Sequence, residues 1–226
     1  MSRQPSVAIV DYGMGNLFSV QRACEQVGLP SAISSDPAVV LAADGVILPG
    51  VGAFGDAMAM LQRLGLASAL REFAASGKPL FGICLGMQLL MRESHEFGRH
   101  EGLGLIDGDV VRLDGATPSG RPCKVPQVGW NRVWMPAGRS WQGTPMASAR
   151  DGEYFYFVHS FYVRPGDPSV IAAVTRYGAT EFCSAVRRHN IFATQFHGER
   201  SGPQGLQLYR HLAQHVRQAT PESVHV

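Results

Sequence analysis

The sequence lacks the cysteine patterns that mark metal sites and disulfide-bonded proteins. Its four cysteines, Cys24, Cys84, Cys123 and Cys183, lie far apart and include no C-x-x-C pair. Neither a zinc site nor a disulfide framework is therefore indicated. Isolated, reduced thiols are typical of a cytoplasmic protein, and we expect this location and no bound metal.

Long apolar runs and clusters of like charge are also missing. No apolar stretch approaches the ~18 residues of a membrane span, and the first expected strand starts too close to Met1 to leave room for a signal peptide. The 20 basic and 18 acidic side chains give a formal net charge of +2, and the basic ones form no run typical of nucleic-acid binding. We expect neither a membrane nor a nucleic acid as a partner.

A third glycine is missing after Gly13 and Gly15. The dinucleotide fingerprint G-x-G-x-x-G needs this residue, so the sequence predicts no dinucleotide and indicates no other cofactor. These absences leave a globular chain of 226 residues, 45% of them hydrophobic, which can bury a sizeable core.

The residues that are present alternate between short apolar runs and helical patterns. In the first half we expect strands at 6–10, 31–34 and 45–48, and helices from residue 17 and over 38–42, 56–64 and 66–75. The later segments are strand-like, at 102–113, 125–135, 154–163, 170–175 and 181–186. This β-α-β order predicts a mostly parallel sheet covered by helices, with ligands beyond the carboxyl ends of the strands. Because no linker or repeat divides the chain, we expect one domain over residues 1–226.

One apolar run, residues 79–90, contains a cysteine between two glycines. We interpret Gly82, Cys84 and Gly86 as a sharp turn between a buried strand and a helix, which presents Cys84 as an exposed nucleophile. The helix N-terminus favours the thiolate and offers N–H groups to an oxyanion. An isolated cysteine is more often a buried core residue, but the flanking glycines favour the nucleophile.

Two further segments are expected near the same edge of the sheet. The loop after the third strand contains Gly50 and Gly52, which let backbone N–H groups approach a ligand, although an ordinary turn is the alternative. A late apolar strand ends at His197 and Glu199, and residues i and i+2 of an extended chain face the same side. His197 can then exchange a proton with the nucleophile while Glu199 orients its ring. His159 is better explained as a strand-core or pocket-lining residue.

A cysteine elbow, a glycine-rich loop and a late His-x-Glu, in this order, resemble the class I (triad) glutamine amidotransferases. More narrowly, the chain is similar to the glutaminase subunits of imidazole glycerol phosphate synthases, which serve histidine biosynthesis. The resemblance is carried by the segments 11–17, 48–54, 82–88, 128–131, 156–160 and 192–197, of which the first and fourth narrow it to these subunits. It implies a three-layer, flavodoxin-like α/β fold with a mostly parallel central sheet and extra antiparallel strands in the second half.

The resemblance also implies a chemistry. Cys84 attacks the carboxamide of L-glutamine, ammonia leaves, and water releases glutamate from the thioester. His197 acts as general base and acid, with Glu199 as its orienting carboxylate. The oxyanion hole is formed by backbone N–H groups of Leu85 and of the loop at Val51 and Gly52, where in this family a peptide flip can complete the hole.

Binding residues and a protein partner are implied as well. The positions that match glutamine-binding residues of the family are Gly50, Gly52, Gln88, Ser160 and Phe161. The partner is a (β/α)₈ cyclase that forms a heterodimer with the chain and receives the ammonia through an internal channel. Asn16, Trp130 and Arg200 match positions that face this cyclase, and Trp130 is expected in a polar turn.

Gly198 departs from the family pattern, because proline usually separates the histidine from the glutamate. Glycine gives the unfolded chain more freedom, which we expect to affect the rate rather than the reaction. Three other functions are compatible with the sequence: a stand-alone thiol hydrolase, a glutaminase that serves another synthase, such as one for surface-sugar amination, and a catalytically silent scaffold that binds the cyclase. A silent scaffold would be expected to have lost a triad residue, and all three are present.

Overall fold

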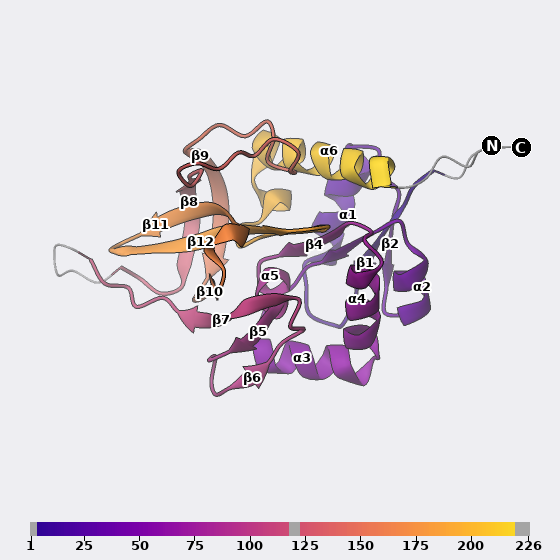
Figure 1. Ribbon diagram of the computed structural model, residues 1–226, viewed down its shortest axis with the longest axis horizontal. Helices are drawn as coiled ribbons and strands as arrows, with labels where there is room; N and C mark the ends of the chain where they lie inside the picture. Colours follow the sequence, from indigo (N-terminus) through magenta and orange to yellow (C-terminus); the bar gives the residue numbers. More distant parts are fainter. Residues whose placement is uncertain (1–3, 118–122, 220–226) are drawn as a thin grey trace, which may run out of the picture.

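A large mixed sheet runs through the centre of the molecule (Figure 1). The structure is a computed structural model and describes residues 4–117 and 123–219. The parallel part of the sheet has the strand order β2-β1-β3-β4-β13. These strands are β1 (Val7–Val10), β2 (Ser31–Ser34), β3 (Gly45–Leu48), β4 (Leu80–Ile83) and β13 (Ile191–Thr194). All of them lie where the apolar runs predict strands.

Mainly antiparallel strands extend the sheet beyond β13. They are β12 (Thr180–Arg188), β10 (Phe161–Pro165), β7 (Ile106–Arg112), β5 (Met91–Ser94) and β6 (His100–Glu101), with β11 (Ile171–Tyr177) paired to β12. The predicted mostly parallel central sheet with added antiparallel strands is confirmed. The strands β5 and β6 are not in the prediction, because their sequences, MRES and HE, are mostly polar and form no apolar run.

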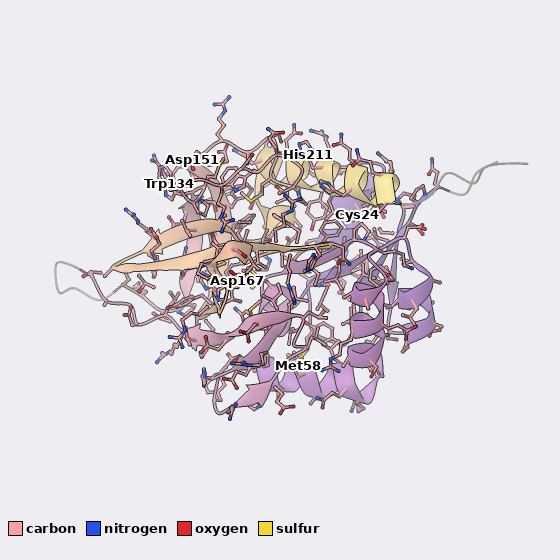
Figure 2. All side chains as sticks on the ribbon, in the orientation of Figure 1. Cys24, Met58, Trp134, Asp151, Asp167 and His211 are labelled. Atoms are coloured by element: carbon pink, nitrogen blue, oxygen red, sulfur yellow. The ribbon has the colours of Figure 1, made fainter. Side chains whose placement is uncertain are left out.

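Helices cover both faces of the sheet and produce the expected three layers (Figure 1). One face carries α2 (Pro37–Ala42), α3 (Phe54–Arg63) and α4 (Leu66–Ala75), and the other carries α1 (Leu17–Gln26) and α6 (Gly202–Ala219). Side chains of β1 alternate between the two layers, because successive residues of a strand point to opposite faces. Figure 2 labels Met58 of α3 and Cys24 of α1, which lie in these two separate cores.

Short elements complete the fold. They are α5 (Leu85–Leu89) and two 3₁₀ turns, η1 (Pro168–Val170) and η2 (Gly198–Arg200). Within the part of the chain that the structure describes, no helix is long and apolar enough to cross a membrane.

A second, two-stranded sheet lies beside the main one. It pairs β8 (Gln127–Val133) with β9 (Glu153–His159) in antiparallel fashion. The single strand predicted at 154–163 is wrong, because the chain breaks at Ser160 and continues as β10 in the main sheet. The expected turn at Trp130 is also wrong, since this residue lies within β8 and is 54% exposed. Its exposure excludes a core position.

Candidate active site

Cys84 lies between β4 and α5 in a strained backbone conformation, with φ 55° and ψ −112°. Such dihedral angles are costly outside glycine and concentrate at functional sites. The glycine two residues later serves close packing, since a Cβ on Gly86 would lie 1.7 Å from the carbonyl oxygen of Leu48. The turn is therefore sharp because the cysteine itself accepts positive φ, while Gly86 lets the elbow pack against β3.

The expectation of an exposed nucleophile is wrong, because Cys84 is only 5% exposed. Its Sγ lies 3.7 Å from the carbonyl oxygen of Val158 at the end of β9, which covers it. The thiol nevertheless borders a cavity of about 200 Å³. Several predicted binding residues lie on the walls of this cavity, namely Val51, Gly52, Leu85, Gln88, Ser160 and Phe161. Cys84 is thus buried but open to a small ligand.

His197 is held by its backbone and by its ring. Its N–H donates to the carbonyl oxygen of Tyr156 at 2.9 Å, and its own carbonyl oxygen accepts from the Ser201 hydroxyl at 2.6 Å. Its Nδ1 lies 2.7 Å from Oε1 of Glu199. The structure therefore brings the two predicted residues together, but the chain between them forms the turn η2 rather than the extended strand that the sequence argument assumed.

The charges beside His197 favour its protonated form. Burial lowers the pKa of the ring, but the charges of Cys84 and Glu199 outweigh burial and raise this pKa to about 10. Because Nδ1 is engaged with Glu199, Nε2 is the nitrogen available for proton exchange, and it has no hydrogen-bond partner among the described residues. This arrangement suits a thiolate and imidazolium pair.

His159 has the opposite environment. Burial lowers its pKa to about 4, and its ring packs near the rings of Phe157 and Phe182. Its Nδ1 lies 2.9 Å from the carbonyl oxygen of Phe161. The ring is therefore neutral at physiological pH, and His159 both packs in the strand core and lines the cavity, the two positions that the sequence analysis favoured.

In the glycine-rich loop after β3, some residues line the cavity and others do not. Gly52 has φ +100° and lies on the cavity wall with Val51. Gly50 does not line the cavity; a Cβ there would lie 2.1 Å from Oη of Tyr12 and 3.0 Å from Cβ of Leu85. A glycine is needed here for close packing under the loop, and glutamine binding by Gly50 stays a prediction.

Two buried polar residues next to the thiol or the cavity escaped the sequence analysis. Glu96 lines the cavity, and its Oε2 accepts from the backbone N–H of Phe54 at 2.7 Å. Burial raises the pKa of Glu96. Gln195 is fully buried, and its Nε2 lies 3.6 Å from Sγ of Cys84. Gln195 lies within the segment 192–197, which carries the family resemblance and could have pointed to it. Glu96 follows a polar stretch that contains no motif.

The three predicted interface residues are exposed, and two of them share one neighbour. The rings of Trp130 and Tyr156 meet edge to face at 6.2 Å, and the guanidinium of Arg200 lies 4.6 Å from the centre of the Tyr156 ring. Trp130, Tyr156 and Arg200 form what we call the aromatic row. Asn16 directly precedes α1 and is exposed.

We expect Gly198→Pro to raise the free energy of unfolding by about 0.4–1 kcal/mol. Gly198 is the first residue of η2 and follows His197, whose φ of −96° and ψ of 96° are extended. Proline suits a first helical position and restricts the unfolded chain. Urea denaturation would measure the change. Gly198→Ala is the matched control, because a Cβ here lies 3.3 Å from Cε2 of Tyr209. A lower free energy of unfolding in the proline variant but not in the alanine variant would show that the φ angle of residue 198 does not suit proline.

Comparisons with known proteins agree with this geometry. The profile of the family described as "Glutamine amidotransferase class-I" matches residues 8–215. The imidazole glycerol phosphate synthase subunit HisH of Moorella thermoacetica is 48% identical over 214 residues, which cover 94% of this chain and 96% of that protein. The HisH subunit of Rhodopirellula baltica is 49% identical over 207 residues, covering 92% and 96%.

Solved structures support the fold. The structure of PurLQS from Thermotoga maritima is similar with a TM-score of 0.70 and 19% sequence identity, covering 93% of this chain and 98% of that one. A structure described as a glutamine amidotransferase has a TM-score of 0.69 and 18% identity, covering 93% and 99%. Together with the profile match and the two HisH relatives, these similarities lead to one conclusion: the chain belongs to the class I glutamine amidotransferase family.

Proposed function

We propose that this chain is the glutaminase subunit of an imidazole glycerol phosphate synthase and serves histidine biosynthesis. The observation that carries the proposal is the strained, buried Cys84 at a small cavity, next to the His197 and Glu199 pair. Relatives at 48% and 49% identity over nearly their whole length bear the name of this subunit. We also propose that the chain acts as one domain, because β9 of the small sheet holds His197 by its backbone.

In the proposed reaction, Nε2 of His197 carries out each proton transfer. In the thiolate and imidazolium pair the proton of Cys84 lies on Nε2 of His197, and Sγ attacks the carboxamide carbon of glutamine to form a tetrahedral intermediate. Nε2 then gives the proton to the departing nitrogen, the C–N bond breaks, and ammonia and a γ-glutamyl thioester result. Water then attacks the thioester with the neutral His197 as base, which releases glutamate and restores the thiolate and imidazolium pair. Glu199 holds the ring so that Nε2 faces the reaction.

The oxyanion of each intermediate needs two N–H donors. Leu85 is the first residue of α5, so its N–H has no partner within the helix. The peptide joining Val51 and Gly52 is the second donor, after a rotation that the glycine permits. Val51 is 43% exposed, so its side chain does not block this rotation.

Glutamine is held by the cavity walls. Gln88 lies on the wall with Ser160 and Phe161, and the backbone groups of these two residues and of Gly52 complete the polar surface. Glu96 adds a carboxylate to an otherwise uncharged lining, and the α-amino group of glutamine is a cation that a carboxylate binds. Gly50 supports the loop from behind.

We expect Glu96→Gln to raise the KM for glutamine by about tenfold or more and to change kcat less. A charge-assisted hydrogen bond contributes about 1.5–3 kcal/mol, and the amide keeps the shape but loses the charge. Steady-state kinetics of glutamate release would measure both constants. Glu93→Gln is the control, because Glu93 pairs with the exposed Arg99 and does not line the cavity. An unchanged KM in Glu96→Gln would remove Glu96 from the glutamine site.

The partner in this proposal is a (β/α)₈ cyclase that forms a heterodimer with the chain and receives the ammonia. Trp and Arg are enriched among interface residues that dominate binding energy, and the aromatic row presents both. Asn16 is the third residue assigned to this interface.

Trp130→Ala should weaken the association with the cyclase by about 2 kcal/mol or more. Arg200→Glu should weaken it as well, because it reverses a charge opposite an acidic partner residue. Titration of labelled cyclase against each variant would measure the affinities. Arg63→Glu, at the C-terminal end of α3, is the control for the charge reversal. Unchanged affinity in both variants would contradict this interface.

Glutamate release tests the function as a whole. We expect the isolated chain to hydrolyse glutamine slowly and the cyclase with its nucleotide ligand to raise the rate, because the partner favours the conformation with a complete oxyanion hole. Full glutaminase activity without the cyclase, or none with it, would overturn the proposal.

A further inference from the structure

The ends of two neighbouring strands place Gln195 beside the nucleophile. In the parallel pair β4 and β13, Ile83 lies opposite Thr194. The next residue on each strand is Cys84 on one side and Gln195 on the other, and the Cys84 N–H donates to the Thr194 carbonyl oxygen at 2.8 Å. The Gln195 N–H donates to the carbonyl oxygen of Ser184 at 2.9 Å, which ties its backbone to β12. The position of this side chain is therefore determined by the register of the sheet.

A backbone carbonyl determines which way the two glutamine amides point. Nε2 of Gln88 lies 2.9 Å from the carbonyl oxygen of Phe161, which can only accept a hydrogen bond. The same nitrogen lies 3.0 Å from Oε1 of Gln195, so that oxygen is the acceptor of the second bond. The Gln195 amide then has one orientation left, in which Nε2 donates toward Sγ of Cys84 at 3.6 Å. Gln88 thus donates to Gln195, and Gln195 donates toward Cys84. The carbonyl oxygen of Phe161 determines both amide orientations, so neither amide has to be flipped by assumption.

This geometry separates two kinds of donor at the sulfur. His197 gives its proton away during the reaction, whereas an amide N–H does not titrate and remains a donor throughout. An ionised acceptor binds an N–H more strongly than a neutral one, so the Gln195 amide favours the thiolate over the thiol. At its other end, Gln195 uses one N–H of Gln88 while Phe161 uses the second. The oxygen of Gln88 is then the atom left for the substrate.

We propose that Gln195 is a second, permanent donor to the Cys84 thiolate and at the same time locks the orientation of Gln88, so that nucleophile and substrate site are coupled through one amide. This inference rests on the proposed glutaminase function. It assigns Gln195 two separable effects, one on the reactivity of the sulfur and one on glutamine binding.

Two variants separate these effects. Gln195→Glu is nearly isosteric and keeps an oxygen acceptor for Gln88, but it replaces the amide N–H at the sulfur by an oxygen atom. Gln195→Met is similar in length and loses both groups. Gln127→Met is the matched control, since Gln127 is a buried glutamine on β8 whose amide atoms have no partner among the described residues.

The first measurement is alkylation of Cys84 by iodoacetamide in the intact chain, followed by peptide mass spectrometry, with the partly exposed Cys123 as the internal reference. We expect the rate at Cys84 to fall about tenfold or more in both Gln195 variants, as for loss of a hydrogen bond to a charged group. The Cys123 rate, and both rates in Gln127→Met, should stay at the wild-type value. Equal Cys84 rates in wild type and Gln195→Glu would overturn the proposal.

The second measurement is glutaminase kinetics in the complex with the cyclase. Gln195→Glu should lower kcat about tenfold or more and leave KM within about twofold, whereas Gln195→Met should lower kcat and also raise KM. A merely structural role would change stability without this separation of kcat from KM. If the wild-type complex released no glutamate, the proposed function would fail, while the alkylation rates would still decide the role of Gln195.

Discussion

Cys84→Ala should lower glutamine-dependent synthesis by about 10³-fold or more and leave synthesis from added ammonia intact in the reconstituted complex. Removing the nucleophile of a triad enzyme costs several orders of magnitude in kcat, because the covalent intermediate can no longer form. The cyclisation itself is assigned to the other subunit, so it needs only ammonia. Alanine is smaller than cysteine, so the substitution introduces no new steric contact at the elbow.

The measurement compares product formation from glutamine and from ammonium salt at the same enzyme concentration. Cys123→Ala is the control for loss of a thiol, because Cys123 is only partly buried and lies outside the cavity. Glutamine hydrolysis by Cys84→Ala at a rate comparable with wild type would show that another group is the nucleophile. Loss of the ammonia-dependent reaction would contradict the assignment of the cyclisation to the other subunit alone.

Gly86→Ala should lower the free energy of unfolding by about 3 kcal/mol or more and abolish glutaminase activity. Overpacking of a dense interior costs about 1–3 kcal/mol, and occasionally more. Here the new Cβ would lie 1.7 Å from the backbone oxygen of Leu48, a separation that rotation of a side chain cannot relieve. The elbow must move away from β3, and the strained Cys84 moves with it.

Urea denaturation and glutamate release would measure the two effects. Gly104→Ala is the control, because Gly104 has φ +66° and nothing within 4 Å of an added Cβ. It should cost only the strain of a left-handed residue, about 1–2 kcal/mol, without affecting Cys84. Wild-type stability in Gly86→Ala would mean that β3 shifts to make room, and the packing argument for the elbow would then be wrong.

The sequence predicts individual strands and helices better than it predicts how they pair. Residues 154–163 alternate as one strand, because a period of two reports which face a side chain takes and says nothing of the neighbouring strand. The structure divides this stretch at Ser160 between two sheets. In the first half, the alternation of apolar runs and helical patterns was sufficient to predict the strands, because parallel strands buried on both faces form short continuous apolar runs.

The candidate site follows the same division. Motifs pointed to Cys84, His197 and Glu199, since each stands in a local pattern of glycines or at a strand end. The cover over Cys84 and the position of Gln195 depend on contacts with residues more than 70 positions away in sequence. No local window contains that information. Glu96 reaches the cavity through a hydrogen bond to the start of α3, which is equally remote from any motif.

The place of β13 has a consequence for a chain that is still being synthesised. This strand is the last one along the described chain, yet it lies between β4 and β12 in the middle of the main sheet. The strand β4 ends just before Cys84. Until β13 has left the ribosome, the edge of β4 that β13 will cover is unpaired, and such an edge can pair with other chains. The same strand delivers His197, so an unfinished polypeptide contains the cysteine without its base. The base that activates Cys84 and the strand that covers the edge of β4 are therefore synthesised together, near the end of the chain.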